Sequence, residues 1–403
     1  MLTLDKFEEA EKIVKNVTLP TPLIYSEYLS DRYDNEIYIK PENMQRTGAY
    51  KVRGAYYKIS TLSEEQRKLG LITASAGNHA QGVAFAAQKF GAKAVIVMPT
   101  TTPLIKVNRT KSYGAEVVLY GDVFDESSAY AQKLAEEKGY TYIPPFDDLT
   151  VATGQGTIGM EIFQELPLVD YILVPVGGGG LAPGVATFAK LFRPETKVIG
   201  AVPSGPNSLP VSLDKGEVTT LPSVNTIADG TAVKTPGSKI FPYLKDNLDD
   251  VVTVDDSDII ASFLDMVENH KMIAEGSGLL TIAALSKLKF KGKKVVSIIS
   301  GGNMDVITMS SVIQQGLIFR DRIFTVSVLL PDKPGELAEV SNTIAKVQGN
   351  VIKLEHNQFV STNRKAEVEL RITLEAFGTE HKAEIMDALE RGGYRPRLTR
   401  TVI

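Results

Sequence analysis

The sequence contains no cysteine, and its 403 residues include only four histidines. The lack of cysteine excludes disulfides, thiolate nucleophiles and cysteine metal sites, and it is compatible with a reducing interior. Four scattered histidines, His79, His270, His356 and His381, disfavour a multi-histidine metal centre. We therefore expect no metal and a cytoplasmic location.

The sequence also lacks a surplus of positive charge and any long apolar run. Its 48 acidic and 44 basic residues give a net charge of -4, so no excess of cations is present to neutralise a phosphate backbone. The run LLTIAALSKL falls well short of the roughly 20 residues that a membrane helix requires. The first residues, MLTLDKFEEAEKIVKN, are charged and amphipathic, unlike a signal peptide. We expect no nucleic-acid partner, no membrane partner and no export.

The composition is otherwise that of a globular protein. Hydrophobic residues make up 43% and charged residues 23% of the chain, which argues against disorder, a coiled coil or a fibrous protein. A chain of 403 residues exceeds one ordinary hydrophobic core, so two or three packed units are expected. The sequence is therefore typical of a soluble enzyme.

Short apolar runs alternate with helix-like stretches from about residue 36 to 300. LITAS precedes AQGVAFAAQKFG, AVIVMP precedes LIKVNRTKSYG, and YILVPV precedes APGVATFAKLF. Each pair reads as strand, loop and helix, the pattern of a mostly parallel α/β sheet. Ligands of such sheets bind outside the carboxyl ends of the strands, so the loops after the apolar runs are the places to look for chemistry.

The pattern changes after residues 316–322. The strand FTVSVLL, a turn at PDKPGE and a helix are followed by the strand NVIKLEHN, a further strand, the helix EHKAEIMDALERG and the strand RPRLTRTVI. One apolar stripe on the first helix contains Leu337, Val340, Ile344 and Val347. The third strand carries the alternating apolar residues Val368, Leu370, Ile372 and Leu374. The order βαββαβ predicts a ferredoxin-like unit.

One glycine-rich loop lies between the apolar run YILVPV and the helix that follows it. It consists of Gly177, Gly178, Gly179, Gly180 and Leu181. Glycine permits close backbone approach, and a helix amino terminus presents unpaired N–H groups to an anion. The loop is a candidate phosphate cradle; taken alone, it is also compatible with a flexible turn.

Two other loops hold the same position at strand ends. Ser75, Ala76, Gly77, Asn78 and His79 follow LITA, and Ser300-Gly301-Gly302-Asn303 follows VVSII. Three such loops in one sheet favour a phosphorylated ligand at a shared mouth. Lys51 lies in the segment TGAYKVRGA, and composition alone does not distinguish it from a solvated surface lysine.

Together these segments resemble the fold-type II pyridoxal-phosphate (PLP) enzymes, in particular the threonine dehydratase (threonine ammonia-lyase) family, with serine racemase close by. TGAYKVRGA resembles the lysine motif of the family, SAGNHAQG its substrate and ring loop, GGGGL its phosphate loop and SGGN its ring-nitrogen loop. The motifs occur in family order over most of residues 1–320. Tyr50 departs from the phenylalanine that more often precedes the lysine, but an aromatic ring is kept.

The resemblance implies a function for each motif. Lys51 would hold PLP covalently and act as the base at Cα, with Tyr50 packed beside the cofactor. Gly177, Gly178, Gly179, Gly180 and Leu181 would bind its phosphate, Asn78 its phenolic oxygen and Ser300 its pyridine nitrogen. Ser75, Ala76, Gly77, Asn78 and His79 would meet the substrate carboxylate. Glu275 matches a family segment near the active site, and a helix-start carboxylate is an equally good interpretation.

The resemblance also implies a domain plan. A PLP-dependent catalytic domain would cover residues 1–320, with a smaller subdomain, at about 52–153, inserted in the larger one. Residues 324–403 resemble an ACT regulatory domain, in which Asp332, Gly335 and Leu337 would bracket a pocket for an amino-acid effector such as isoleucine or valine. A dimerisation module that binds nothing is the alternative. A homodimer or homotetramer is expected.

The implied reaction is the deaminating dehydration of L-threonine to 2-oxobutanoate and ammonia, with L-serine giving pyruvate. A serine racemase or serine dehydratase is the alternative, because no motif locates or excludes an acid on the face of the ring opposite Lys51. An amino-acid-sensing regulator on an inactive enzyme scaffold is the alternative from another class. Retention of Lys51 argues against the sensor.

Overall fold

The computed structural model describes residues 1–205, 208–357 and 368–401. Its contacts divide the chain into two units, Met1–Asp305 and Val306–Ile403. The division falls before helix α14 (Val306–Phe319), whereas the sequence analysis placed it near residue 320.

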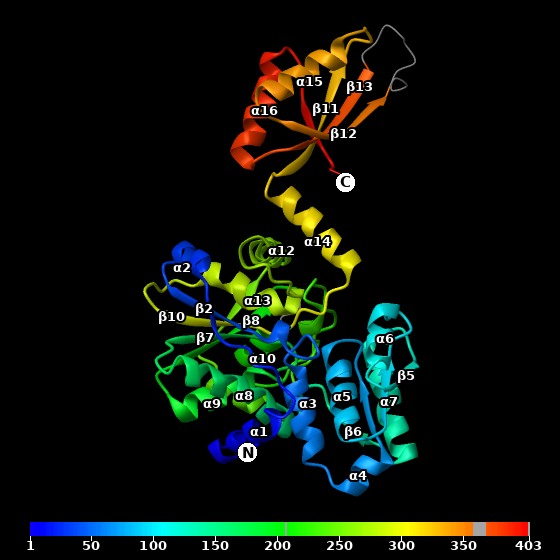
Figure 1. Ribbon diagram of the computed structural model, residues 1–403, viewed down its shortest axis with the longest axis vertical. Coiled ribbons are helices and arrows are strands. Elements are labelled where there is room, and N and C mark those ends of the chain that lie inside the picture. Colours follow the sequence, from blue (N-terminus) through cyan, green and yellow to red (C-terminus); the bar gives the residue numbers. More distant parts are fainter. Residues whose placement is uncertain (206–207, 358–367, 402–403) are drawn as a thin grey trace. The chain divides into compact units, whose positions relative to one another are not determined.

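The first unit contains a large lobe built on a six-stranded sheet (Figure 1). Only its edge strand runs antiparallel to its neighbour, so the sheet is mostly parallel as predicted. In sheet order the strands are β1 (Ile24–Tyr25), β2 (Glu36–Pro41), β10 (Lys294–Ile299), β7 (Tyr171–Pro175), β8 (Lys197–Pro203) and β9 (Asp250–Val254). The α-helices of this lobe are α1 (Leu4–Val14), α2 (Glu27–Tyr33), α8 (Leu149–Glu165), α9 (Ala182–Phe192), α10 (Ser208–Lys215), α11 (Phe241–Asn247), α12 (Asp256–Asp265) and α13 (Gly276–Ala284).

A small lobe is built on a second, four-stranded sheet whose strands are all parallel. Its order is β5 (Glu116–Leu119), β4 (Ala94–Met98), β3 (Leu71–Ala74) and β6 (Thr141–Tyr142). Its helices are α3 (Lys51–Ser60), α4 (Glu64–Leu69), α5 (Asn78–Lys89), α6 (Leu104–Lys111) and α7 (Phe124–Lys138). The apolar strands β3 and β4 are buried along their whole length, as expected for parallel strands covered on both faces.

Helix α3 joins the two lobes, because it packs against α5 on one side and α8 on the other (Figure 1). Glycines permit the close approach to α8: a Cβ atom on Gly154 would lie 2.8 Å from the Cα of Gly54. Lys51 is the first residue of α3. The residue that the family motif singles out therefore lies where the lobes meet.

The second unit has the βαββαβ order that the sequence predicts. Its strands and helices are, in chain order, β11 (Ile323–Leu330), α15 (Glu336–Lys346), β12 (Asn350–Asn357), β13 (Val368–Glu375), α16 (Thr379–Arg391) and β14 (Arg397–Thr399), after α14. They form an antiparallel sheet of order β12-β13-β11-β14. Residues 402 and 403, which end the last predicted strand, lie outside the described residues.

The core of this unit follows the predicted pattern with one exception. The alternating residues of β13 are all buried, as are Val340 and Ile344 of α15, and Val347 is partly buried against them. Leu337, predicted on the same stripe, is 39% exposed. It lies in the first turn of α15, shortly after Gly335, which has a left-handed φ of 99°.

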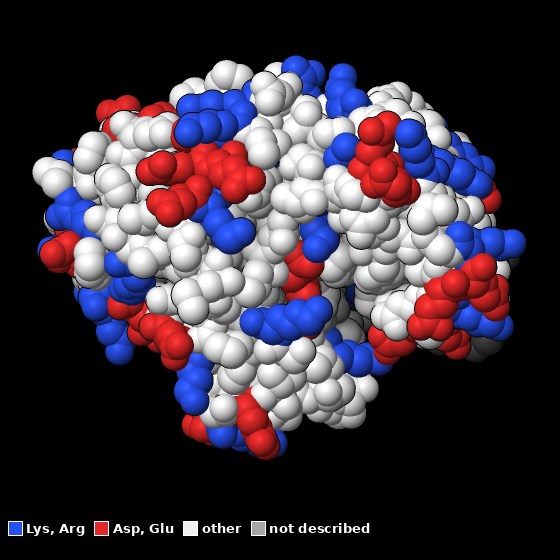
Figure 2. Space-filling view, turned by 90° about the horizontal axis from the view of Figure 1, so that it is seen from below, with Lys and Arg blue, Asp and Glu red and all other residues white. Residues whose placement is uncertain are grey.

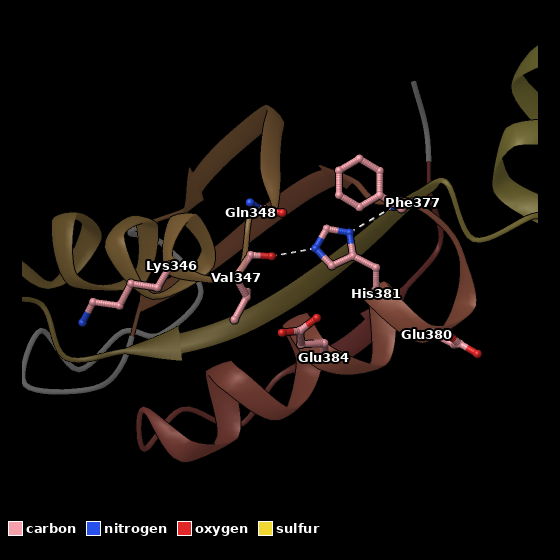
Figure 3. Close-up of a pocket in the computed structure, with 7 residues that line it drawn as sticks. All are labelled: Lys346, Val347, Gln348, Phe377, Glu380, His381 and Glu384. Atoms are coloured by element: carbon pink, nitrogen blue, oxygen red, sulfur yellow. Dashed lines mark hydrogen bonds between the residues drawn. The ribbon is translucent and has the colours of Figure 1, made fainter.

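His381 of α16 ties this helix to two backbone segments (Figure 3). Its Nδ1 accepts a hydrogen bond from the backbone N–H of Phe377 at 3.0 Å, so the proton lies on Nε2, which donates to the carbonyl oxygen of Val347 at 2.6 Å. The Phe377 ring stacks on the imidazole although it is 80% exposed. Both ring nitrogens are therefore used in holding the unit together.

On the face shown in Figure 2, positive (blue) and negative (red) side chains are mixed, without a large field of one sign. Within the described residues, no helix is long and apolar enough to cross a membrane. The same part of the chain contains no group of three or more His, Asp or Glu side chains that could hold a metal ion.

Candidate active site

Lys51 has the environment of a reactive amine. Its Nζ donates a hydrogen bond to the carbonyl oxygen of Pro145 at 2.6 Å and lies 5.4 Å from the centre of the Tyr50 ring. Burial lowers the pKa of Lys51 to about 8, against a smaller opposing effect of the Glu275 charge. The amine therefore becomes neutral, and nucleophilic, at a much lower pH than a solvated lysine.

The lysine segment and the Ser300–Asn303 loop are joined through their backbones. The N–H of Tyr50 donates to the carbonyl oxygen of Ser300 at 3.0 Å, and the N–H of Gly302 donates to that of Gly48 at 2.9 Å. Ala49 and Gly301 form an antiparallel bridge between these contacts. Ser300, which directly follows β10, is 4% exposed. Two of the motifs singled out by sequence are thus directly connected.

Asn78, the first residue of α5, connects a third motif to this group. Its Nδ2 donates to Oε1 of Glu275 at 2.5 Å, and its Oδ1 accepts from Nδ2 of Asn303 at 2.7 Å. Glu275 is the N-cap residue of α13, so it lies at a helix start and contacts Asn78 at the same time, although it forms no side-chain cap hydrogen bond. Burial, followed by the Asp229 charge, raises the pKa of Glu275 to about 7.

The other residues of the Ser75–His79 loop are held within the small lobe. Oγ of Ser75 accepts from the N–H of Gly77 at 3.2 Å. His79 is 2% exposed, and its Nε2 lies 3.0 Å from the carbonyl oxygen of Ile143. Burial, reinforced by the Lys51 charge, lowers the pKa of His79 to about 3, so the ring is neutral. Its Nδ1 has no partner among the described residues.

The glycine-rich loop enters α9 and fits the phosphate of PLP. Gly178, Gly179 and Gly180 are buried. Among the described residues, no protein acceptor takes the backbone N–H groups of these three glycines. Buried N–H groups without acceptors at the start of a helix form an anion site. The loop has no room for a side chain at Gly178, because a Cβ atom there would lie 2.7 Å from the Phe146 ring.

Pro145 and Phe146 connect this loop to Lys51, although neither is among the predicted site residues. Pro145 accepts the Lys51 hydrogen bond, and a Cβ atom on Gly180 would lie 3.0 Å from the Cα of Phe146. Both residues follow β6, so they occupy a strand end of the small sheet. The other loops are predicted from the apolar strands that precede them, whereas the two-residue strand β6 carries too weak an apolar signal to predict the loop that follows it.

Asn303 and Arg109 were also missed as site residues. NH1 of Arg109, on α6, donates to Oδ1 of Asn303 at 2.9 Å, although the two residues are 194 positions apart. The structure thus brings together the lysine segment, the Ser75–His79 loop and the Ser300–Asn303 loop. The Pro145–Phe146 segment links Lys51 to the glycine-rich loop. The turn predicted to bind an effector, at Asp332, belongs to the second unit.

The chain is similar to known proteins in sequence and in fold. The L-threonine ammonia-lyase of Thermotoga maritima is 43% identical over 99% of this chain and 100% of its own length. The processed threonine deaminase isoform 2 of Solanum lycopersicum, a solved structure, superposes with a TM-score of 0.75 at 42% identity over 78% of this chain and 90% of that one. Maize serine racemase gives a TM-score of 0.74 at 33% identity over 79% of this chain and 98% of that one.

The family model for pyridoxal-phosphate dependent enzymes matches residues 14–301, which include Lys51, the glycine-rich loop and Ser300. The matched residues belong to the first unit, which contains the two lobes. The chain therefore belongs to the family of pyridoxal-phosphate dependent enzymes, alongside the L-threonine ammonia-lyases.

Proposed function

We propose that this chain dehydrates and deaminates L-threonine, giving 2-oxobutanoate and ammonia, with L-serine giving pyruvate as a side reaction. The observation that carries the proposal is the buried Lys51 amine, whose pKa is lowered to about 8, in a chain similar over its whole length to an L-threonine ammonia-lyase. PLP, when bound, supplies an electron sink that stabilises negative charge at Cα of an amino acid.

The residues of this chain would divide the remaining tasks. Lys51 would hold the cofactor, and its amine, when free, would take the proton from Cα of the substrate. The same Nζ can then donate a proton to the departing β-hydroxyl. Its lowered pKa suits both steps, because an amine that titrates near the working pH can gain and lose a proton with little driving force against either.

Binding and orientation would come from the loops. Backbone N–H groups of Gly177 to Leu181 would bind the phosphate, and Asn78 would donate to the phenolic oxygen of the ring. Ser300 would offer the pyridine nitrogen a hydroxyl, which unlike a carboxylate would not hold that nitrogen protonated, and a weaker electron sink would favour prompt loss of the leaving group. Ser75, Ala76, Gly77 and His79 belong to the loop that receives the substrate carboxylate.

The test is release of 2-oxo acid from L-threonine by protein supplied with PLP. Wild-type protein is expected to form 2-oxobutanoate, and Lys51→Ala to lose most of the activity, by about a thousandfold or more, together with the visible absorption of the bound cofactor. Lys68→Ala, an exposed lysine of α4 that forms an ion pair with Glu64, is the matched control and should retain both. Absence of any 2-oxo acid from wild-type protein would refute the proposal.

Serine racemase is the second candidate, because the maize enzyme shares the fold at 33% identity over 79% of this chain. Incubation with L-serine separates the two reactions. Pyruvate exceeding D-serine is expected of a dehydratase, and D-serine exceeding pyruvate would reverse the assignment.

For the second unit we propose the role of an ACT-like regulatory domain that binds an amino acid such as isoleucine or valine near Asp332, Gly335 and Leu337, within a homodimer or homotetramer. We also propose that the enzyme works in the cytoplasm, in keeping with its lack of cysteine. Leu337→Ala should raise the isoleucine concentration needed for a half-maximal change in activity, while Leu329→Ala, similarly exposed on β11, should not. If neither isoleucine nor valine changed the activity of wild-type protein, the second unit would instead be interpreted as a dimerisation module that binds no effector.

A further inference from the structure

A chain of side-chain hydrogen bonds crosses three times between the two lobes of the first unit. Arg109 of the small lobe donates to Oδ1 of Asn303 at 2.9 Å, and Asn303 donates from Nδ2 to Oδ1 of Asn78 at 2.7 Å. Asn78, again in the small lobe, donates from Nδ2 to Glu275 of the large lobe at 2.5 Å. Asn303 also donates to the carbonyl oxygen of Thr47 at 2.7 Å, four residues before Lys51.

The order of donors and acceptors in this hydrogen-bond network determines the orientation of each side-chain amide. A guanidinium has only donors, so it requires the oxygen of Asn303 on its side. A backbone carbonyl can only accept, so Thr47 requires the Asn303 nitrogen. Asn303 therefore presents N–H to Asn78, and the oxygen of Asn78 must face it.

We propose that Asn303, oriented by Arg109 and Thr47, is a positioning residue that turns the Asn78 amide so that N–H, and not oxygen, faces the cofactor. The inference rests on the proposed contact of Asn78 with the phenolic oxygen. Nδ2 carries two N–H groups, and among the described residues only Glu275 accepts from it, which leaves one N–H for the cofactor. A turned amide would set its oxygen against the phenolic oxygen and against Glu275.

Space around the network leaves the Asn303 side chain little freedom. A Cβ atom on Gly48, whose φ is +72°, would collide with Oδ1 of Asn303, so only glycine fits there. A Cβ atom on Gly301 would collide with Oε1 of Glu275 and would lie 3.0 Å from Nδ2 of Asn78. The two glycines lie in the backbone segments that join the lysine motif to the Ser300 loop, so the site and the network share one framework.

Asn303→Asp is the sharpest test, because it keeps the shape and removes the donor. A carboxylate at this position repels the Asn78 oxygen and accepts from its nitrogen, so the Asn78 amide should turn. We expect the dissociation constant of PLP to rise about tenfold to a hundredfold, the cost of losing one hydrogen bond to a charged oxygen. The constant is measured by titrating PLP into stripped protein, that is, protein from which PLP has been removed. The visible absorption band of the bound cofactor should shift as well. Asn303→Ala should show a smaller loss, because it frees the amide without turning it.

A double variant separates positioning from a merely structural role. In Asn303→Asp/Glu275→Gln, the new amide at position 275 can donate to the turned Asn78 oxygen, so the link between positions 78 and 275 is restored with its polarity reversed, while the Thr47 carbonyl still lacks its donor. We expect part of the thermal stability lost in Asn303→Asp to return while PLP affinity stays low. Return of stability and affinity together would overturn the inference, since affinity would then only report folding.

Asn43→Asp is the matched control. Asn43 also donates a side-chain amide N–H to a backbone carbonyl, that of Ile273, at 2.9 Å, without a hydrogen bond to Asn78. Its PLP affinity should stay within about twofold of wild type. Asn303→Asp with wild-type affinity and an unshifted band would also refute the inference. These readouts are independent of turnover, so a protein that binds PLP but leaves L-threonine unchanged would refute the proposed function without touching the role of Asn303.

Discussion

The Nζ atom of Lys51 donates a hydrogen bond to the carbonyl oxygen of Pro145 at 2.6 Å, and the next residue, Phe146, packs against the glycine-rich loop. Two consecutive residues that follow β6 therefore hold the lysine motif close to the proposed phosphate cradle. A carbonyl oxygen accepts from an ammonium and from a neutral amine alike, so the contact orients Nζ without fixing its charge.

The first prediction follows from the pKa of Lys51. Burial lowers it to about 8, so the amine is protonated below that pH and neutral above it. Covalent capture of PLP requires the neutral amine, so the capture rate of stripped protein should rise with pH around a midpoint near about 8, and not near the value of a free lysine. Stopped-flow absorbance measures the rate. Glu275→Gln should move the midpoint lower, because the Glu275 charge opposes the shift; a midpoint at the ordinary value of 10.5 would contradict the assignment.

Gly179 provides the second prediction. Its φ is +100°, and a Cβ atom would lie 2.6 Å from Ile240, so Gly179→Ala combines backbone strain with a collision. We expect a loss of about 2–4 kcal/mol in unfolding free energy and a PLP affinity weaker by about tenfold or more. Gly91→Ala is the control, because Gly91 has a φ of +62° with nothing within 4 Å. Equal losses in the two variants would show that backbone strain alone accounts for the effect.

The sequence predicted the sheets and strand-end loops well, because parallel strands are read from uninterrupted apolar runs such as β3, β4 and β7. It identified Lys51 only through a family motif, since a lysine carries no local signal of its burial. The Arg109–Asn303 contact joins residues 194 positions apart and depends on how two lobes meet. Nothing within either segment specifies that distance, which is why the network emerged only from the structure.

Burial of polar residues shows the same limit. Arg53, two residues after Lys51, is fully buried and forms hydrogen bonds with Glu42 and Glu161, while Lys40 pairs with Glu161 at 2.6 Å. The motif TGAYKVRGA contains this arginine, but its partners lie in α8 and in the one-turn helix η1 (Glu42–Met44). The cluster holds α3 against the large lobe, and so fixes the helix that begins at Lys51.

The third prediction concerns this cluster. Arg53→Met leaves the fully buried Glu42 carboxylate without its charged partner, so it should cost about 3–5 kcal/mol of unfolding free energy, measured by denaturant titration. The double variant Glu42→Gln/Arg53→Met removes the uncompensated charge and should recover part of that loss. The two side chains would act independently if Glu42→Gln lowered the unfolding free energy by the same amount in Arg53→Met as in wild type.

The last prediction uses the Glu275 carboxyl, whose pKa is raised from 4.5 to about 7 by burial and by the Asp229 charge. Between these two values the folded protein holds a proton that the unfolded chain releases. This contribution to stability is therefore complete below pH 4.5 and is lost as the pH rises through about 7. Glu275→Gln has no such proton, so its stability relative to wild type should increase by up to about 3 kcal/mol across that window. Urea unfolding of stripped protein at about pH 5 and about pH 8 gives the comparison, and a difference that does not change with pH would mean that Glu275 is ionised throughout.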